Sequence, residues 1–298
     1  MPELPDIVVY LEALDRHVGG EVVRGFRVLS PAVLRTYDPP YDAIVGSEIT
    51  GLNRIGKRIV IELDNGDLFV VIHLMVAGRL QWKEGKGGAN IPRKVGLAGW
   101  DFDGGTLILT EQGTKKRAGI WIFGSEDEVR GEDRGGVEPL EVTGEEFAAA
   151  LTAQNRTLKR VLTDAHIFSG IGNAFSDEIL WEAQLSPVAR TRQLDDGDVA
   201  RLHQATVSSL NQWTDRLREQ VGEGWPTKVT AFRDEMAVHG KYKEDCPRCG
   251  SPVQRIVYSS NETNYCATCQ TGGKLLADRS LSRLLKDDWP KTVEELEE

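Results

Sequence analysis

The 298-residue sequence lacks long apolar runs, and its first residues lack positive charge. Its longest apolar runs, such as residues 68–71, fall far short of the roughly 20 residues that cross a bilayer. The start, residues 1–6, is acidic where a secretory signal peptide would be basic. Apolar residues make up 40% of the chain and charged residues 28%, as in ordinary folded proteins. We therefore expect a soluble cytoplasmic protein with no membrane partner, and the length suggests about two domains.

The chain also has no excess of positive charge, since 36 Lys and Arg stand against 46 Asp and Glu for a net charge of −10. Phosphate contacts come from Lys and Arg, so this total argues at first against a nucleic-acid partner. The negative charge is concentrated, however, because residues 126–146 carry −7 and residues 287–298 carry −5. Without these two segments the rest of the chain carries +2. The composition permits DNA binding but does not show it, because a basic cluster is usually a solvated face.

The first 125 residues are predicted to form mainly β-strands. Residues 58–63 and 68–72 flank an Asn-Gly pair, which signals a tight turn between two strands. Residues 106–109 and 120–123 suggest another strand pair. Residues 7–18 are the exception, because their apolar positions follow helical spacing. This part of the chain is expected to be a β-sandwich or barrel that begins with a helix.

The second part of the chain is predicted to be helical. A Gly-rich, charged segment at residues 131–139 is typical of a linker, and residues 143–146 resemble a capping box at the start of a helix. Further helices are expected over residues 155–166, 173–184, 197–220 and 226–236. Helical spacing returns over residues 275–285, before an acidic end.

The four cysteines give the strongest signal of chemistry. They stand in the pattern C-x2-C-x16-C-x2-C, at Cys246, Cys249, Cys266 and Cys269. Zn²⁺ is bound by four soft ligands in a tetrahedron, and each C-x2-C turn supplies two of them. A pair of disulfides or a redox centre is the less favoured alternative in a cytosolic chain. Because four cysteines leave no position for a catalytic water, we predict a structural zinc site; whether the surrounding ribbon braces the fold or contacts DNA stays open.

A second motif, Gly170-Ile171-Gly172-Asn173, stands immediately before a predicted helix. Two glycines let backbone N–H groups approach an anion, and a helix N-terminus adds a positive dipole. Asn173 can donate a side-chain N–H to the same phosphate. Without further support, an Asn that simply caps the helix is the more frequent explanation.

The third feature is the N-terminus, Met1-Pro2-Glu3. Removal of Met1 would leave Pro2 as a free secondary amine, and an α-amino group with a pKa near 8 has an appreciable neutral fraction in the cell. Such an amine attacks an aldehydic carbon to give an iminium ion, which is an electron sink. Glu3 beside it can move protons. A chain that keeps Met1 would instead hold Pro2 as an amide.

Together these features resemble the formamidopyrimidine-DNA glycosylase/endonuclease VIII family of base-excision repair enzymes. The resemblance covers about nine tenths of the chain, and the motifs occur in the family's order and spacing. They are Met1-Pro2-Glu3-Leu4-Pro5, Gly56-Lys57, His73-Leu74, Gly136-Val137-Glu138-Pro139-Leu140, Gly170-Ile171-Gly172-Asn173, Asp177-Glu178-Ile179-Leu180 and Cys269-Gln270. Their occurrence together is far more specific than any single motif.

The resemblance implies an α+β fold with four parts. These are an N-terminal catalytic β-sandwich with a leading helix (1–130), a helical domain with a helix–two-turn–helix motif (131–240), a zinc ribbon (241–271) and an acidic helical tail (272–298). It also implies one structural Zn²⁺ per chain as the cofactor. The implied partner is double-stranded DNA that contains damaged bases or abasic sites, bound by a monomer at the bacterial nucleoid.

The resemblance further implies roles for individual residues. Pro2 matches the nucleophile at sugar C1′, Glu3 the acid that assists ring opening, and Lys57 a lysine that contacts phosphate or the lesion strand. The implied DNA-binding residues are Lys116, Arg117, Gly172, Asn173 and Asn261. The implied activity is that of a DNA glycosylase and AP lyase, in which a Schiff base at Pro2 is followed by β- and δ-elimination.

Several positions depart from the family's pattern. Asn261 replaces an arginine that grips phosphate, Val76 replaces a methionine that fills the space of the extruded base, and Ala118 replaces an aromatic wedge. Met75 or Trp121 is a candidate to take over the filling of that space. These departures leave the preferred lesion open and keep a second hypothesis, a non-catalytic DNA-binding or damage-sensing member of the family. The enzyme is favoured because a sensor has no need of a catalytic amine and acid.

Overall fold

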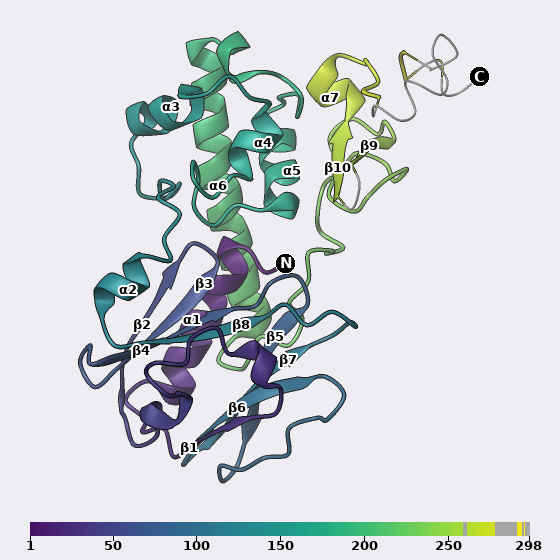
Figure 1. Ribbon diagram of the computed structural model, residues 1–298. Coiled ribbons are helices and arrows are strands. Elements are labelled where there is room, and N and C mark those ends of the chain that lie inside the picture. Colours follow the sequence, from purple (N-terminus) through teal and green to yellow (C-terminus); the bar gives the residue numbers. More distant parts are fainter. Residues whose placement is uncertain (259–260, 278–290, 294, 296–298) are drawn as a thin grey trace. The chain divides into compact units, whose positions relative to one another are not determined.

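The computed structural model describes residues 1–258, 261–277, 291–293 and 295. The chain divides into two compact units, drawn in Figure 1. The N-terminal unit consists of residues 1–134 and 213–230, and the C-terminal unit of residues 135–212 and 231–298. The finer division into four domains stays a prediction. Most of the helix predicted over residues 275–285 lies outside the described residues.

Helix α1 (Leu4–Val18) opens the N-terminal unit and confirms the helix predicted from spacing. Glu3 and Asp6 form a capping box at its start, which satisfies backbone N–H groups that lack partners in the first turn. The apolar face of the helix, which includes Ile7 and Leu14, is fully buried. Burial of this face fixes α1 in the core, so the chain start is held by the fold.

Two antiparallel four-stranded sheets follow, as the sandwich prediction requires. One has the order β1 (Gly25–Val28), β6 (Gly96–Phe102), β7 (Gly105–Glu111), β5 (Gly78–Glu84). The other has the order β2 (Ile49–Ile55), β3 (Arg58–Leu63), β4 (Leu68–His73), β8 (Gly119–Phe123). Residues of α1 and of both sheets share one apolar core cluster. Short helices complete the unit: η1 (Pro31–Val33), η2 (Tyr41–Ile44) and α2 (Glu126–Arg130).

The predicted hairpin over residues 58–63 and 68–72 is confirmed as β3 and β4, but the predicted pairing of 106–109 with 120–123 is wrong. Strand β7 pairs with β5 and β6, whereas β8 pairs with β4 in the other sheet. The physical reason is that both edges of β7 are already occupied. The chain therefore crosses to the second sheet, in a turn where the Glu111 carboxylate accepts the backbone N–H groups of Arg117 and Ala118.

The helix predicted over residues 226–236 is also wrong, because this segment is irregular. The Trp225 indole donates a hydrogen bond to the carbonyl of Leu80 at 2.9 Å, and its ring lies 5.9 Å from that of Tyr10. The carbonyl of Val229 accepts a hydrogen bond from Arg79 Nε at 2.6 Å. The Val229 carbonyl, which would accept a backbone hydrogen bond inside a helix, instead holds the segment against the sheet residues of the N-terminal unit.

The C-terminal unit contains short helices around a small aromatic core. They are α3 (Gly144–Thr152), α4 (Leu158–Leu162), α5 (Asn173–Glu182), η3 (Thr191–Gln193) and the first residues of α6 (Asp196–Val221). The predicted capping box at Thr143 and Glu146 is confirmed, and the helix predicted over 155–166 is shorter than expected. Phe147 and Phe168 pack with ring centroids 4.7 Å apart.

The ribbon at the end of this unit is a hairpin of β9 (Val253–Tyr258) and β10 (Asn261–Cys266), followed by α7 (Ala267–Thr271). The α+β class with a leading helix, a helical domain and a ribbon is therefore confirmed. Among the described residues, no helix has both the length and the apolar character of a membrane span.

Candidate functional site

The chain start is a buried, acid-lined site. Pro2 and Glu3 are both buried, and only 2% of Glu3 is exposed. The capping box at the start of α1 holds the Glu3 carboxylate, while the Glu3 backbone N–H donates to Asp6 Oδ2 at 2.9 Å. Two carboxylates are thus fixed beside the first peptide of the chain, where a proton acceptor is needed if the amine reacts.

Lys57 reaches the same site from the turn between β2 and β3. The turn is tight because Gly56 takes a φ of 58°, a left-handed conformation that glycine adopts readily. Burial lowers the pKa of the Lys57 amine, and the negative charge of Glu3 opposes this effect. The charges of Glu3 and Lys57 interact, so the structure brings together the predicted catalytic residues Pro2, Glu3 and Lys57.

The amino group of Met1, at the chain start, has a lowered pKa as well. Its pKa falls below the ordinary value of 8.0, mainly because of burial; Glu3 raises the pKa and Arg79 lowers it. Arg79 was not predicted from the sequence. It stands at the start of β5, where its Nη1 donates to the carbonyl of Gly78 at 2.6 Å. Burial and positive charge at the chain start thus favour the neutral form of an amine placed there, and the neutral form is the nucleophilic one.

His73, at the end of β4, is a neutral neighbour of this site. Its pKa is lowered to about 4 by burial and by the positive charges of Arg58, Lys57 and Arg134. Its Nδ1 lies 2.6 Å from the sulfur of Met75. A histidine with this pKa is uncharged and only weakly basic at neutral pH, so His73 adds no positive charge to the site.

Acidification is expected to destabilise the protein through His73. In the unfolded chain this histidine takes up a proton near pH 6.5, whereas in the folded protein it does so only near pH 4. Stability is therefore present above pH 6.5 and is lost as the pH falls toward 4, by up to about 3 kcal/mol. Urea unfolding at pH 7 and pH 4.5 measures this loss, and His73→Gln should reduce it. An equal loss in wild type and variant would contradict the assignment.

The GIGN segment places Asn173 against the ribbon. Gly172 is the N-cap of α5 and Asn173 its first residue, so the alternative that Asn173 caps the helix is wrong. Instead, Asn173 Nδ2 donates to the backbone carbonyl of Glu262 on β10 at 2.9 Å. The predicted phosphate-binding residues Gly172 and Asn173 are thus held next to the first residues of β10.

The other predicted DNA-binding residues lie on loops and strand ends. Asn261 is exposed at the start of β10, and Arg117 is exposed in the loop after β7. Lys116, half-buried in the same loop, donates to the carbonyl of Glu111. Ala118 is buried in the core with 1% exposed, so it packs as a core residue, whereas Val76 is 59% exposed and free to contact a ligand.

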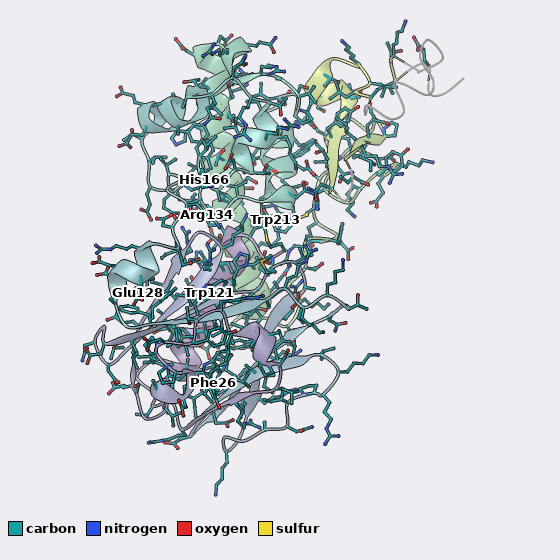
Figure 2. The ribbon with its side chains drawn as sticks, in the orientation of Figure 1. Phe26, Trp121, Glu128, Arg134, His166 and Trp213 are labelled. Carbon is teal, nitrogen blue, oxygen red and sulfur yellow. The ribbon has the colours of Figure 1, made fainter. Side chains whose placement is uncertain are left out.

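The two candidate space-filling residues, Met75 and Trp121, have structural contacts. Met75 takes a φ of 53° and lies against His73, while Trp121 on β8 has the Arg58 guanidinium 5.7 Å from its ring centroid. Figure 2 labels Trp121 among the side chains of the N-terminal unit. Both candidates are therefore held by neighbouring side chains, whereas Val76, at the position of the family's methionine, is 59% exposed.

The sequence analysis missed a buried polar network at α5. The Glu178 carboxylate accepts backbone N–H groups of Ala237, Val238 and His239 at 2.8–3.0 Å, and burial raises its pKa. Asp177 beside it accepts from Lys159 Nζ at 2.6 Å. A signal was present, because Asp177 and Glu178 are adjacent acids within one of the motifs that carry the resemblance, but their partners lie far along the chain.

Asp177 also contacts the ribbon and the segment that precedes it. Its Oδ2 lies 2.7 Å from His239 Nδ1 and accepts the Asn264 backbone N–H at 3.2 Å. Asn264 Oδ1 accepts the Gly240 N–H at 2.9 Å. The network thus ties α5, the segment before the ribbon and β10 to one another, which positions Asn173 and β10 as one body.

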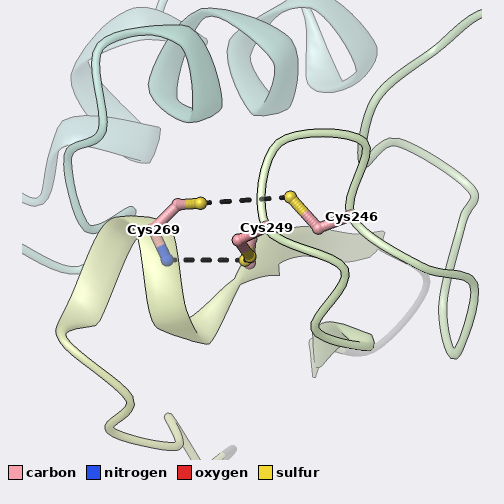
Figure 3. Close-up of side chains that lie close together, drawn as sticks. Cys246, Cys249 and Cys269 are labelled. Carbon is pink, nitrogen blue, oxygen red and sulfur yellow. Dashed lines mark hydrogen bonds between the residues drawn. The ribbon is translucent and has the colours of Figure 1, made fainter.

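The four cysteines of the ribbon meet in one place, as predicted. Their sulfur atoms all lie within 4.8 Å of one another. Cys249 Sγ and Cys266 Sγ are 3.4 Å apart. Cys246 Sγ and Cys269 Sγ are 4.0 Å apart, and a dashed line joins them in Figure 3. A tetrahedral Zn²⁺ with Zn–S bonds of about 2.3 Å needs sulfur atoms about 3.8 Å apart, so the donor set fits one structural zinc ion. The ion would hold the two C-x2-C turns of the ribbon together, and the four cysteines complete its coordination.

Three family models match the chain. The "Formamidopyrimidine-DNA glycosylase N-terminal domain" matches residues 1–113, the "Formamidopyrimidine-DNA glycosylase H2TH domain" residues 136–216, and the "Zinc finger found in FPG and IleRS" residues 243–272. An uncharacterized formamidopyrimidine-DNA glycosylase-like protein of Mycobacterium tuberculosis is 40% identical over 151 residues, covering 51% of this chain and 94% of the relative. The formamidopyrimidine-DNA glycosylase of Herpetosiphon aurantiacus is 28% identical over 286 residues, covering 91% and 100%.

Solved structures show the same fold. A variant of the Lactococcus lactis protein in complex with Fapy-dG containing DNA has a TM-score of 0.78 at 23% identity, covering 91% of this chain and 100% of that chain. The Lactococcus lactis protein with abasic site containing DNA has a TM-score of 0.77 at 23% identity, covering 90% and 99%. The arrangement of sheets, helices and ribbon is thus shared with these proteins.

Proposed function

The chain belongs to the formamidopyrimidine-DNA glycosylase family of base-excision repair, and we propose that it both releases damaged bases and cuts the DNA strand, with the amine of Pro2 as nucleophile. The observation that carries the proposal is the meeting of Pro2, Glu3 and Lys57 at one buried site. The proposal requires removal of Met1, which frees the proline nitrogen. The proposed partner is a DNA duplex, and the similar Lactococcus lactis proteins form complexes with Fapy-dG containing DNA and with abasic site containing DNA.

The chemistry follows from a neutral amine beside a carboxylate. The Pro2 nitrogen forms a bond to C1′ of an everted nucleotide, and the bond from C1′ to the base breaks as the base takes up a proton. Glu3 delivers a proton to the sugar ring oxygen as the C1′–O4′ bond opens, which leaves an iminium ion between Pro2 and C1′. The iminium acidifies the C2′ proton, so its removal expels the 3′ phosphate, and a second elimination expels the 5′ phosphate. Water then hydrolyses the iminium and returns the amine.

The cationic groups of the site are proposed to bind the strand and to tune the amine. Lys57 and Arg79 both lower the pKa of the Met1 amino group, and they are proposed to act in the same way on the Pro2 amine once Met1 is removed; both carry the charge that phosphate attracts. Gly172, Asn173 and Asn261 are proposed to contact phosphate from the C-terminal unit. Such contacts offset the few kcal/mol that eversion of a nucleotide costs. The protein is proposed to act as a cytoplasmic monomer on double-stranded DNA.

Incision of a duplex with a single abasic site tests the proposal. We expect the purified protein to cut the labelled strand without added cofactor and to leave phosphate at both ends of the gap. Protein prepared with Met1 retained, verified by intact mass, is the matched control and should bind without cutting. Tight binding by the Met1-free protein with no incision would instead identify a damage-sensing member of the family and overturn the proposed activity.

A further inference from the structure

Trp181, on the last turn of α5, makes an unusual contact with the metal site. Its indole Nε1–H donates a hydrogen bond to the sulfur of Cys246 at 3.3 Å. The ring also packs on the apolar cluster that contains Cys246, Cys266 and Val253. A tryptophan N–H is a donor only, and the sulfur of a metal-bound cysteine is negatively charged, so the contact is charge-assisted when the metal is present.

Arg248 holds the tryptophan in this orientation. Its guanidinium lies 4.0 Å from the centroid of the Trp181 ring, and its Nη1 donates to the backbone carbonyl of Trp181 at 2.8 Å. Arg248 stands between the first two cysteines, so the same turn that supplies Cys246 and Cys249 also fixes the ring. The guanidinium adds a positive charge near a site where four thiolates outweigh a divalent ion.

The second C-x2-C turn is tied to the chain just after α5 as well. Gln270 Nε2 donates to the carbonyl of Leu185 at 2.9 Å, and its Oε1 accepts the Cys266 backbone N–H at 2.8 Å. At the other end of the helix, Asn173 donates to Glu262 on β10. Helix α5 is therefore attached to the ribbon at both of its ends, and one attachment is to a metal-binding sulfur.

We propose that Trp181 is a positioning residue for the zinc site, which stabilises the thiolate of Cys246 and couples retention of the metal to helix α5. The hydrogen bond from Trp181 disperses part of the negative charge on the Cys246 sulfur. It also holds that sulfur in a fixed position. Groups of this kind around a metal site change metal affinity 10- to 100-fold when they are removed. The inference depends on the zinc site alone and is independent of the chemistry proposed for Pro2.

Release of zinc from the full-length protein to a chromogenic chelator tests the proposal. Trp181→Phe keeps an aromatic ring but removes the donor, and we expect roughly 10- to 100-fold weaker zinc retention. Trp121→Phe makes the same change on β8 of the N-terminal unit and serves as the matched control, with zinc retention expected to equal that of wild type. Arg248→Met, which leaves the tryptophan in place, should have an intermediate effect.

Cobalt substitution separates hydrogen bonding from mere packing. In Co²⁺-loaded protein, loss of the donor leaves more electron density on sulfur, so the thiolate-to-cobalt charge-transfer band of Trp181→Phe should move to longer wavelength. Circular dichroism checks that the variant is folded. Zinc release and a cobalt spectrum identical to those of wild type in folded Trp181→Phe would overturn the proposal, whatever the protein does to DNA.

Discussion

Glu3→Gln is expected to slow base release and strand cutting by roughly 100- to 10,000-fold, which is the usual contribution of a positioned general acid or base. The variant keeps a carbonyl oxygen at the same place, so the capping of α1 by residue 3 is preserved. What is lost is the ability to deliver a proton to the sugar. Single-turnover cleavage of a duplex with one damaged base measures the loss directly.

Glu12→Gln is the matched control for this prediction. Glu12 lies on the same helix and pairs with Arg218 at 2.6 Å, so the substitution removes an equal charge away from the chain start. Because exposed ion pairs contribute about 0–1 kcal/mol, the control should retain wild-type cleavage with at most a small loss of stability. If Glu3→Gln cleaves as fast as Glu12→Gln, another group moves the proton.

Removal of zinc is expected to unfold the ribbon and to abolish tight binding of abasic-site duplex. The apolar clusters of the ribbon are small, so its fold depends on the metal, and structural zinc sites contribute about 10–16 kcal/mol of apparent binding free energy in small zinc-binding peptides. Cys249→Ser removes one ligand and should leave little zinc in the purified protein. We expect the affinity for duplex to fall at least about tenfold, since β10 then no longer holds Asn173.

Thr271→Val is the control for zinc loss. Thr271 is two residues from Cys269 and its hydroxyl donates to the backbone carbonyl of Ala267 at 2.8 Å, but it supplies no metal ligand. Zinc content by elemental analysis and duplex affinity should both match wild type in this variant. Full affinity for duplex in zinc-free Cys249→Ser would show that the ribbon is not part of the DNA-binding surface.

Much of the fold could be predicted from local signals. Three patterns each specify a local structure without reference to the rest of the chain. They are the apolar spacing of residues 7–18, the Asn-Gly turn between β3 and β4, and the C-x2-C pairs. Strand partners could not be predicted in the same way. Whether β8 pairs with β7 or β4 depends on which sheet edge is free, and this is a property of the whole sandwich.

The site was predictable only in part, for a related reason. Pro2, Glu3 and Lys57 were identified from motifs, whereas the contribution of Arg79 depends on how β5 is placed against the chain start. The segment after α6 has helix-forming residues but is used for docking, through the indole of Trp225 and the carbonyl of Val229. Tertiary hydrogen bonds of this kind override local propensity.

The central claim, that the secondary amine of Pro2 bonds to the sugar, is tested most directly by borohydride reduction on abasic-site DNA followed by peptide mapping. The account predicts one adduct, on the nitrogen of an N-terminal peptide that begins at Pro2 and lacks Met1. A reduced adduct on Lys57 or any other lysine, or full incision by protein whose mass still includes Met1, would contradict it.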